Sequence, residues 1–238
     1  MIIKRNKGYV KENDNYYKAY EKRYKQVYKK NMMWSSDSFT PDVINTINQF
    51  SISKSDRILD LGCGEGRDAI YLLENNYNVL AVDYSKTVIK KCNEITNNRF
   101  KNSFKQLDLL VEQLDMEFDF IYSIAVMHMF LLEQHRNQYL QFIYKHLRKD
   151  GKALICVLGN GNDEFCSKIE DAFKSVKRKV FNNNSNIFVA ATSCKVVNWT
   201  NFEKELTNNN FKIVQKWISN KIPEFNEAMC VVIKKEKG

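Results

Sequence analysis

Three glycines at alternate positions, Gly62, Gly64 and Gly66, follow a short apolar run and precede a stretch with helical periodicity. Glycine in a turn between a strand and a helix lets the backbone come close to a ligand. A dinucleotide fingerprint, Gly-x-Gly-x-x-Gly, would need its third glycine where this chain has Arg67. Asp60, just before the glycines, would repel a pyrophosphate but tolerates an ammonium group. The pattern therefore favours a cationic, amino-acid-like cofactor over a dinucleotide.

Two further acids end apolar runs downstream of the glycines. Asp83 follows the run 79–82, and a carboxylate at the carboxyl end of a strand beside a glycine turn can accept both hydroxyls of a ribose. Asp108 ends the next run, where it can accept an exocyclic amine while Leu109 covers an aromatic base. An isolated Asp after a strand is more often a turn or capping residue. In this order and beside the glycine turn, the acids predict one crevice for a nucleoside-bearing ligand.

From Arg57 onward, short apolar runs alternate with helical ones, which is typical of a parallel sheet with crossover helices. The sequence therefore predicts an α/β fold, a doubly wound sheet preceded by an N-terminal helical arm. The expected strands are 57–61, 78–82, 104–107, 118–124, 153–158, 212–217 and 229–234. The expected helices are 66–75, 86–97, 133–147 and 201–208, with Lys149-Asp150-Gly151 as the turn that ends the third of them.

The N-terminal segment predicts an amphipathic helix. Four tyrosines fall on one stripe at helical spacing: Tyr17, Tyr20, Tyr24 and Tyr28. Arg23 and the lysines of this segment lie largely off the stripe, and the lysines are expected on a solvated face. Thr40-Pro41 predicts a second helix running to about Phe50, capped by Thr40. We expect residues 1–50 to form a helical arm or lid and residues 51–238 a cofactor-binding domain with an inserted lobe at about 159–198.

Composition and charge exclude several classes of protein. The chain has 238 residues, 44% of them hydrophobic and 27% charged, which is ordinary globular composition. Ten bases against three acids in the first thirty residues carry +7 of the net +9, so a basic arm precedes a nearly neutral body. No apolar run approaches the roughly twenty residues of a membrane helix, and no secretory signal is visible. The six cysteines include no Cys-x-x-Cys pair. We expect a cytoplasmic location, no membrane partner and no metal site.

These motifs resemble those of the class I S-adenosylmethionine-dependent methyltransferases over about residues 57–159. The glycines with Asp60 resemble the first motif, Asp83 the ribose-binding acid, Asp108-Leu109 the adenine-binding motif and residues 118–123 the fourth strand. The resemblance implies S-adenosylmethionine as cofactor, S-adenosylhomocysteine as product, and a Rossmann-like, seven-stranded sheet, mostly parallel with the last strand antiparallel. The residues that it implies for cofactor binding are Trp34, Asp60, Gly62, Cys63, Gly64, Asp83, Tyr84, Asp108, Leu109 and Ser123.

The arm narrows the resemblance within this superfamily. Residues 20–24, Tyr-Glu-Lys-Arg-Tyr, followed by Trp34 and Thr40-Pro41, resemble small-molecule methyltransferases related to thiopurine and tellurite-resistance enzymes. The Asp/Asn-Pro-Pro-aromatic motif of many nitrogen methyltransferases is absent, because residues 123–126 are Ser-Ile-Ala-Val. We expect a small-molecule methyl acceptor and a monomer or homodimer. Two alternatives stay open: an RNA methyltransferase whose basic arm grips phosphate and stacks bases, and a protein that binds the cofactor without catalysis.

His128 is the predicted catalytic base if the acceptor arrives protonated, because it follows the fourth strand at the edge where such sheets bind ligands. The alternative is a packed histidine with an ordinary hydrogen bond. His135 and His146 lie in a polar helical context and are expected at the surface. Trp34 and the tyrosine stripe either wall the acceptor pocket, holding a cationic or aromatic substrate by their ring faces, or anchor the arm to the body.

Overall fold

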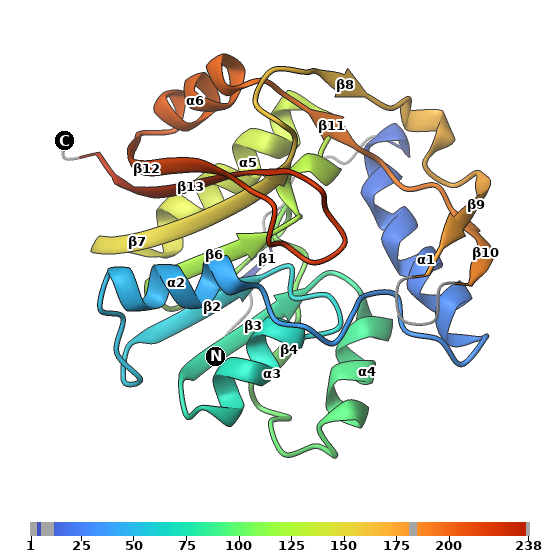
Figure 1. Cartoon of the computed structure of the whole chain (residues 1–238), viewed down its shortest axis with the longest axis horizontal. Helices are drawn as coiled ribbons and strands as arrows, with labels where there is room; N and C mark the ends of the chain where they lie inside the picture. The colour runs from blue at the N-terminus through green and yellow to red at the C-terminus, as the bar shows by residue number, and fades with distance from the viewer. Residues whose placement is uncertain (1–3, 6–11, 181–184, 237–238) are drawn as a thin grey trace.

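A computed structural model describes residues 4–5, 12–180 and 185–236 of the chain. Its main sheet runs, in spatial order, through β12 (Phe211–Ser219), β13 (Ala228–Lys235), β7 (Leu147–Leu158), β6 (Phe118–Ile124), β2 (Arg57–Leu61), β3 (Asn78–Asp83) and β4 (Phe104–Gln106) (Figure 1). The pairs from β7 to β4 are parallel, whereas β13 runs antiparallel to both of its neighbours. The predicted Rossmann-like sheet of seven strands is confirmed, including its antiparallel last strand.

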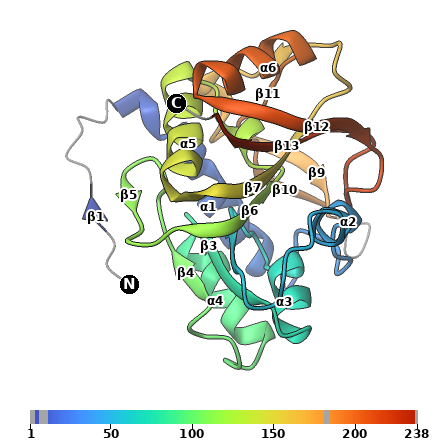
Figure 2. The same ribbon diagram turned by 90° about the vertical axis from the view of Figure 1, so that its left-hand side faces the viewer.

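Helices cover both faces of this sheet (Figure 2). One face packs against α2 (Pro41–Gln49), α3 (Arg67–Glu74) and α4 (Lys86–Ile95), and the other against α5 (Glu133–His146) and α6 (Trp199–Asn208). Alternate side chains of β2 enter the two cores, because Ile58 faces the first set of helices and Leu59 the second. This arrangement leaves the carboxyl ends of the parallel strands at one edge, where the predicted site residues lie.

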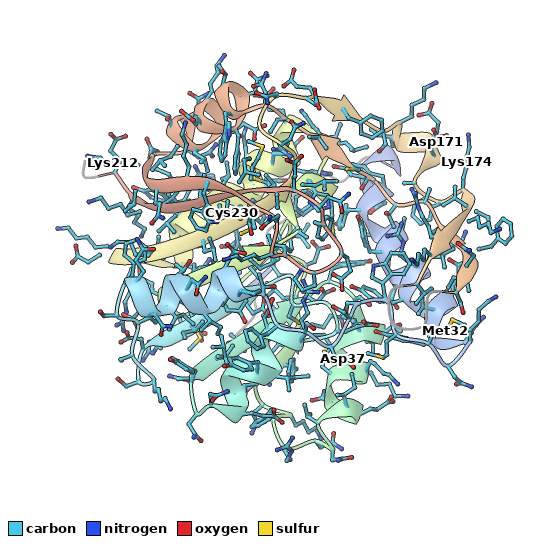
Figure 3. The ribbon with its side chains drawn as sticks, viewed as in Figure 1. Met32, Asp37, Asp171, Lys174, Lys212 and Cys230 are labelled. Atoms are coloured by element: carbon cyan, nitrogen blue, oxygen red, sulfur yellow. The ribbon has the colours of Figure 1, made fainter. Side chains whose placement is uncertain are left out.

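The arm and the lobe lie together beyond this edge. The arm begins as a 3₁₀ turn, Glu12–Lys18, and continues as α1 (Ala19–Tyr28), which packs against the lobe hairpin of β9 (Ser175–Lys179) and β10 (Asn186–Ala190) (Figure 1). Val27 of α1 forms a small apolar cluster with lobe residues, and Met32 packs against it. Figure 3 labels Met32 near the end of α1 and marks the outer side of the lobe with Asp171 and Lys174, which form an ion pair.

Several shorter elements complete the lobe and the margin of the sheet. β8 (Phe165–Cys166) pairs with β11 (Lys195–Val196) inside the lobe, and a 3₁₀ turn, Ile169–Asp171, lies between β8 and β9. β1 (Lys4–Arg5) pairs with β5 (Glu112–Gln113), and a 3₁₀ turn, Met127–Met129, follows β6. No helix within the described ranges has the length and apolar character needed to cross a membrane. The division into a 1–50 arm and a 51–238 domain stays a prediction.

The structure corrects the predicted turn at residues 149–151, which lies within β7. Leu147 already pairs with Phe118, and the next pair joins Lys152 to Phe120, so the residues between them form a bulge. A Cβ at Gly151 would lie 2.9 Å from the carbonyl oxygen of Asp119, which explains the glycine. The strand therefore starts about six residues earlier than the apolar run that revealed it.

Two other local predictions were wrong. The Thr40 hydroxyl does not cap α2. It donates to Asp68 at 2.9 Å, and the Thr40 amide donates to the same carboxylate at 2.6 Å, which ties α2 to α3. His135 and His146 are buried, not at the surface. His135 hydrogen-bonds the Tyr16 hydroxyl at 2.9 Å, whereas one ring nitrogen of His146 lies 2.7 Å from the Phe142 carbonyl oxygen.

Candidate active site

The turn after β2 is held against β3 by its own backbone. The amides of Gly62 and Cys63 both donate to the carbonyl of Val82, at 2.8 and 2.9 Å, and the amide of Gly64 donates to Asp83 Oδ2 at 3.0 Å. Gly62 has a φ of +83°, and a Cβ there would lie 2.4 Å from a methyl group of Val126. A side chain at position 62 would therefore be both strained and blocked.

Asp83 links this turn to the next strand end. Its second oxygen, Oδ1, accepts the Ser85 amide at 2.8 Å, and its carbonyl accepts the Leu107 amide at 2.9 Å. Burial raises the pKa of Asp83 to about 6, although the amides of Ser85 and Gly64 favour its ionised form. Each carboxylate oxygen accepts one backbone amide and keeps a lone pair, so the group can accept two hydroxyls of a ribose.

Asp108 lies one strand further along the same edge. Its Oδ2 accepts the Tyr17 hydroxyl of the arm at 2.9 Å, and its Oδ1 accepts the Leu110 amide at 3.2 Å. Burial raises the pKa of Asp108, and it also raises the pKa of Tyr17. The rings of Tyr17 and Tyr84 meet edge to face with centroids 5.4 Å apart, and Leu109 packs half-buried against the same core. An aromatic base at this place would meet apolar surface and an acceptor for its amine.

Asp60 and Ser123 come from the two central strands. Asp60 lies in β2 with 3% of its surface exposed, and burial together with the nearby Asp68 carboxylate raises its pKa well above the usual range. An ammonium group is a natural partner for such a buried carboxylate. Ser123 is also buried, and its hydroxyl donates to the Leu61 carbonyl at 2.8 Å. The visible role of Ser123 is therefore to join β6 to the start of the glycine turn.

His128 is buried beyond the end of β6, in contact with Phe225 at a ring-centroid distance of 6.0 Å. Burial, and next the charge of Arg136, lowers the pKa of His128 to about 4. The Leu158 amide donates to Nδ1 over a long 3.5 Å, which favours the neutral tautomer with its proton on Nε2. In that tautomer Nε2 is a hydrogen-bond donor, so the surroundings of His128 suit a positioning role better than proton abstraction. Its assignment as a base stays a prediction.

The arm is fastened over the glycine turn at several points. Glu21 accepts the hydroxyl of Thr87 at 2.6 Å and that of Ser85, both at the start of α4. Although burial opposes ionisation, these hydrogen bonds lower the pKa of Glu21. The Tyr24 hydroxyl lies 3.1 Å from the position of a Cβ on Gly64. The arm therefore packs directly on the backbone that the sequence assigns to the cofactor.

The segment after α1 is tied to the same turn. Glu65, between the second and third glycines, accepts the amides of Trp34 and Ser35 at 2.8 Å each and the Ser35 hydroxyl at 2.6 Å. The Trp34 ring is half-buried and stacks against the guanidinium of Arg23 at 4.5 Å. Trp34 therefore lies beside the turn, and its ring already has a neighbour from the arm; its predicted role in cofactor binding stays a prediction.

The structure gathers most of the predicted binding residues at one edge. The set comprises Asp60, Gly62, Cys63, Gly64, Asp83, Tyr84, Asp108 and Leu109. Glycine backbone, ionisable acids and apolar cover in this order fit an adenosyl amino acid such as S-adenosylmethionine. Sequence reasoning missed Glu21, Glu65 and the buried Arg23. Only Arg23 had a usable signal, since helical geometry places it next to Tyr20 and Val27 at the border of the buried stripe.

Residues 37–216 match the family model of a methyltransferase domain. A probable S-adenosyl-L-methionine-dependent methyltransferase, TehB of Haemophilus influenzae, is 30% identical over 111 residues, 46% of this chain and 38% of that protein. The tRNA (carboxymethyluridine(34)-5-O)-methyltransferase alkbh8 of Xenopus tropicalis is 36% identical over 108 residues, 45% of this chain and 16% of that protein. This chain thus spans well under half of the length of either curated relative.

Among solved structures, the 1,6-didemethyltoxoflavin-N1-methyltransferase of Burkholderia thailandensis superposes with a TM-score of 0.68 at 16% identity, covering 99% of this chain and 95% of the other. At that identity the likeness extends to the fold alone. The family match over residues 37–216 shows which class of protein this chain belongs to, and the shared fold agrees with that match. The chain belongs to the class I S-adenosylmethionine-dependent methyltransferases, and part of it is similar to TehB.

Proposed function

We propose that this protein transfers the methyl group of S-adenosylmethionine to a small-molecule acceptor by direct in-line displacement, with S-adenosylhomocysteine as the second product. When bound, this cofactor supplies a methyl group already activated by a sulfonium, so the chemistry needs no covalent intermediate with the protein. The task of the chain is then to hold the cofactor, orient the acceptor and exclude water.

Individual residues take separate parts of that task. Asp83 accepts the ribose hydroxyls, Asp108 accepts the adenine amine, and Asp60 attracts the ammonium group. Tyr84 and Leu109 cover the base. The raised pKa values of the acids, caused first by burial, favour donors and cations as ligands, because either one stabilises the ionised carboxylate.

The observation that supports a small-molecule acceptor is that the arm packs over the candidate site. Tyr24 contacts the glycine turn, Tyr17 binds Asp108, and Tyr20 donates to the lobe carbonyl of Ser193 at 3.2 Å. The Ser193 hydroxyl in turn donates to the Met129 carbonyl at 2.6 Å, just beyond β6. Arm and lobe together thus cover the edge of the sheet, and an enclosed site suits a small acceptor better than a folded nucleic acid.

The test is to incubate the protein with S-adenosylmethionine labelled at the methyl group and a small-molecule cell extract, and then to identify labelled products by mass spectrometry. We expect a labelled small molecule that disappears with Asp83→Asn. Asp119→Asn is the matched control, because Asp119 lies at the opposite edge of the sheet, where it accepts the backbone amide of Arg57 and the guanidinium of Arg148. This control should produce the same labelled molecule as the wild type.

A parallel incubation with total RNA, digested to nucleosides, separates the alternatives. Label found only in nucleosides would replace the small-molecule proposal with the RNA methyltransferase that one relative represents by name. Calorimetric binding of S-adenosylmethionine with no label in either fraction would favour a protein that binds the cofactor without catalysis.

A further inference from the structure

Arg23 is a buried cation on the face of α1 that meets the lobe. Only 7% of its surface is exposed. Its Nε and Nη2 donate to the Ala190 carbonyl at 3.1 and 3.0 Å, and Nη2 also reaches the Ala191 carbonyl and the Thr192 hydroxyl. The guanidinium also stacks on the ring of Trp34. These contacts explain how one side of the guanidinium joins the arm to the lobe.

The charge of Arg23 has no acidic partner in the part of the chain that the structure describes. No carboxylate of the described residues lies within ion-pair distance of it, and its Nη1 donates to none of them. Burial lowers the pKa of Arg23; Tyr20 opposes this shift, and the second guanidinium nearby, Arg178, adds to it. An arginine nevertheless stays protonated in a protein, and an unpaired buried charge is costly. Two neighbouring guanidiniums without an acid between them favour an anion.

The place of Arg23 connects this charge to the proposed active site. The next residue, Tyr24, packs on the glycine turn, and the stacking partner Trp34 hydrogen-bonds Glu65 of that turn. On the lobe side, Thr192 is adjacent to Ser193, which donates to the Met129 carbonyl in the 3₁₀ turn after β6. Arg23 therefore lies where the arm, the lobe and the glycine turn meet, the region that must enclose the methyl acceptor.

We propose that the methyl acceptor is a small acid whose carboxylate or phosphate group binds the free Nη1 of Arg23, with Arg178 adding attraction at the exposed rim. This inference specifies the substrate of the proposed function, and it rests on that function because only a methyltransferase would use the bound anion as a methyl acceptor. It also argues against a cationic acceptor, one of the substrates that the sequence left open for these rings. Arg23 already lies 4.5 Å from the Trp34 ring centre and 5.2 Å from that of Tyr20, so a second cation on these rings would meet a like charge.

The test measures anion binding without requiring turnover. The protein is saturated with S-adenosylhomocysteine and titrated at constant ionic strength with benzoate, phenyl phosphate or neutral benzamide, which share one ring and differ in the head group. We expect calorimetry to give at least tenfold tighter binding of one anion than of benzamide, with a matching rise in the thermal midpoint. The anion that binds more tightly distinguishes a carboxylate acceptor from a phosphate ester.

Variants locate the anion. Arg23→Gln should remove the preference for the anion over benzamide while S-adenosylhomocysteine binding is retained. Lys29→Gln removes an equal charge from the exposed end of the same helix and should keep the preference. Arg178→Gln should weaken anion binding by a few-fold, most visibly at low salt. If Arg23→Gln fails to fold, Arg23→Lys keeps the charge without the fork geometry and should lose most of the preference.

Equal binding of all three probes by the wild type would overturn the inference. So would an Arg23→Gln protein that melts at a lower temperature yet keeps the preference, because Arg23 would then act only as a clamp between arm and lobe. These outcomes differ from a failure of the proposed function, in which S-adenosylhomocysteine and the anion bind normally but no methyl group is transferred. A labelled product that fails to bind an anion-exchange resin would also contradict the inference.

Discussion

The affinity for the cofactor should depend on pH through Asp83. In the structure, this carboxylate accepts the amides of Gly64 and Ser85, and burial raises its pKa to about 6. In the proposed complex the ribose hydroxyls donate to the ionised carboxylate, so a protonated Asp83 must lose its proton before it can accept both of them. Affinity for S-adenosylhomocysteine should therefore rise with pH and level off above about pH 7.

The magnitude follows from the pKa of about 6. At pH 5 a group with this pKa is roughly nine-tenths protonated, so affinity should be about tenfold weaker than at pH 8, or about 1.4 kcal/mol. Asp83→Asn removes the charge and turns an amide NH₂ toward a backbone donor. Because hydrogen bonds to a charged acceptor contribute about 1.5–3 kcal/mol each, the variant should bind roughly a hundredfold more weakly or worse.

The same pKa shift has the opposite sign for folding. The pKa of Asp83 in the folded protein lies above the usual 3.8 of a free carboxyl, so the protonated form favours the folded state. This stabilisation is complete below about pH 4 and is lost as the pH rises through about 6. Cofactor binding to the ionised carboxylate restores stability at neutral pH. The thermal shift caused by S-adenosylhomocysteine should therefore be larger at pH 7 than at pH 5.

The assay is titration calorimetry with S-adenosylhomocysteine from pH 5 to pH 8, in two buffers with different ionisation enthalpies. Because burial also raises the pKa values of Asp60 and Asp108, the contribution of Asp83 is read as a difference between proteins: near pH 5 the wild type should release about one proton more than Asp83→Asn, and at pH 8 the two should release the same number. Asp83→Asn should lose the step near pH 6, and Asp119→Asn should match the wild type, with circular dichroism confirming that both variants fold. The reasoning is refuted if Asp83→Asn keeps the same step, because another group would then control it.

Three further outcomes can be checked. Gly64→Ala should weaken S-adenosylhomocysteine binding about tenfold by calorimetry, because φ there is +52° and the new Cβ would lie 3.1 Å from the Tyr24 hydroxyl. Adding Tyr24→Phe to this variant relieves only the contact, so it should recover only part of the lost affinity. Tyr17→Phe removes a hydrogen bond to Asp108 and should lower the unfolding free energy by about 1 kcal/mol in urea titrations, whereas no change would mean that the arm is held elsewhere. Because burial lowers the pKa of His128 to about 4, the free energy of unfolding should fall as the pH drops from about 6.5 toward 4, and His128→Asn should flatten that fall. The contrary result would be an inflection near pH 6.5 in the pH–rate profile that disappears in His128→Asn, because the imidazole would then titrate as a base.

The sequence predicted the bounds of the central strands more accurately than those of the segments around the sheet. The predicted strands 57–61 and 118–124 match β2 and β6 residue for residue, because parallel strands that are buried on both faces consist mainly of apolar residues. The bulge in β7 escaped prediction, since residues 148–150 are all charged and resemble a turn. Only the pairing of Leu147 with Phe118 reveals the strand.

The candidate site likewise contains residues that the sequence revealed and residues that it did not. Local spacing identified the glycine turn and its acids, because strand, turn and acid are consecutive in the chain and strand order brings their ends together. The contacts of Glu21 with α4 and of Arg23 with the lobe join residues that lie 64 to 169 positions apart. No periodicity encodes such partners. Arg23 and Glu21 also have charged side chains on a helix, which are solvated in most proteins.

The acids at the carboxyl edge of the sheet are better explained by ligand binding than by folding. Burial raises the pKa values of Asp60, Asp83 and Asp108, so each carboxylate is less stable when ionised in the folded protein than in water. Apolar residues of similar size at these positions would avoid that cost. A ligand with an ammonium group, two hydroxyls and an amine satisfies all three carboxylates in one binding event. If the acids bind the cofactor as proposed, the stability that they cost the free protein contributes to the affinity for the cofactor.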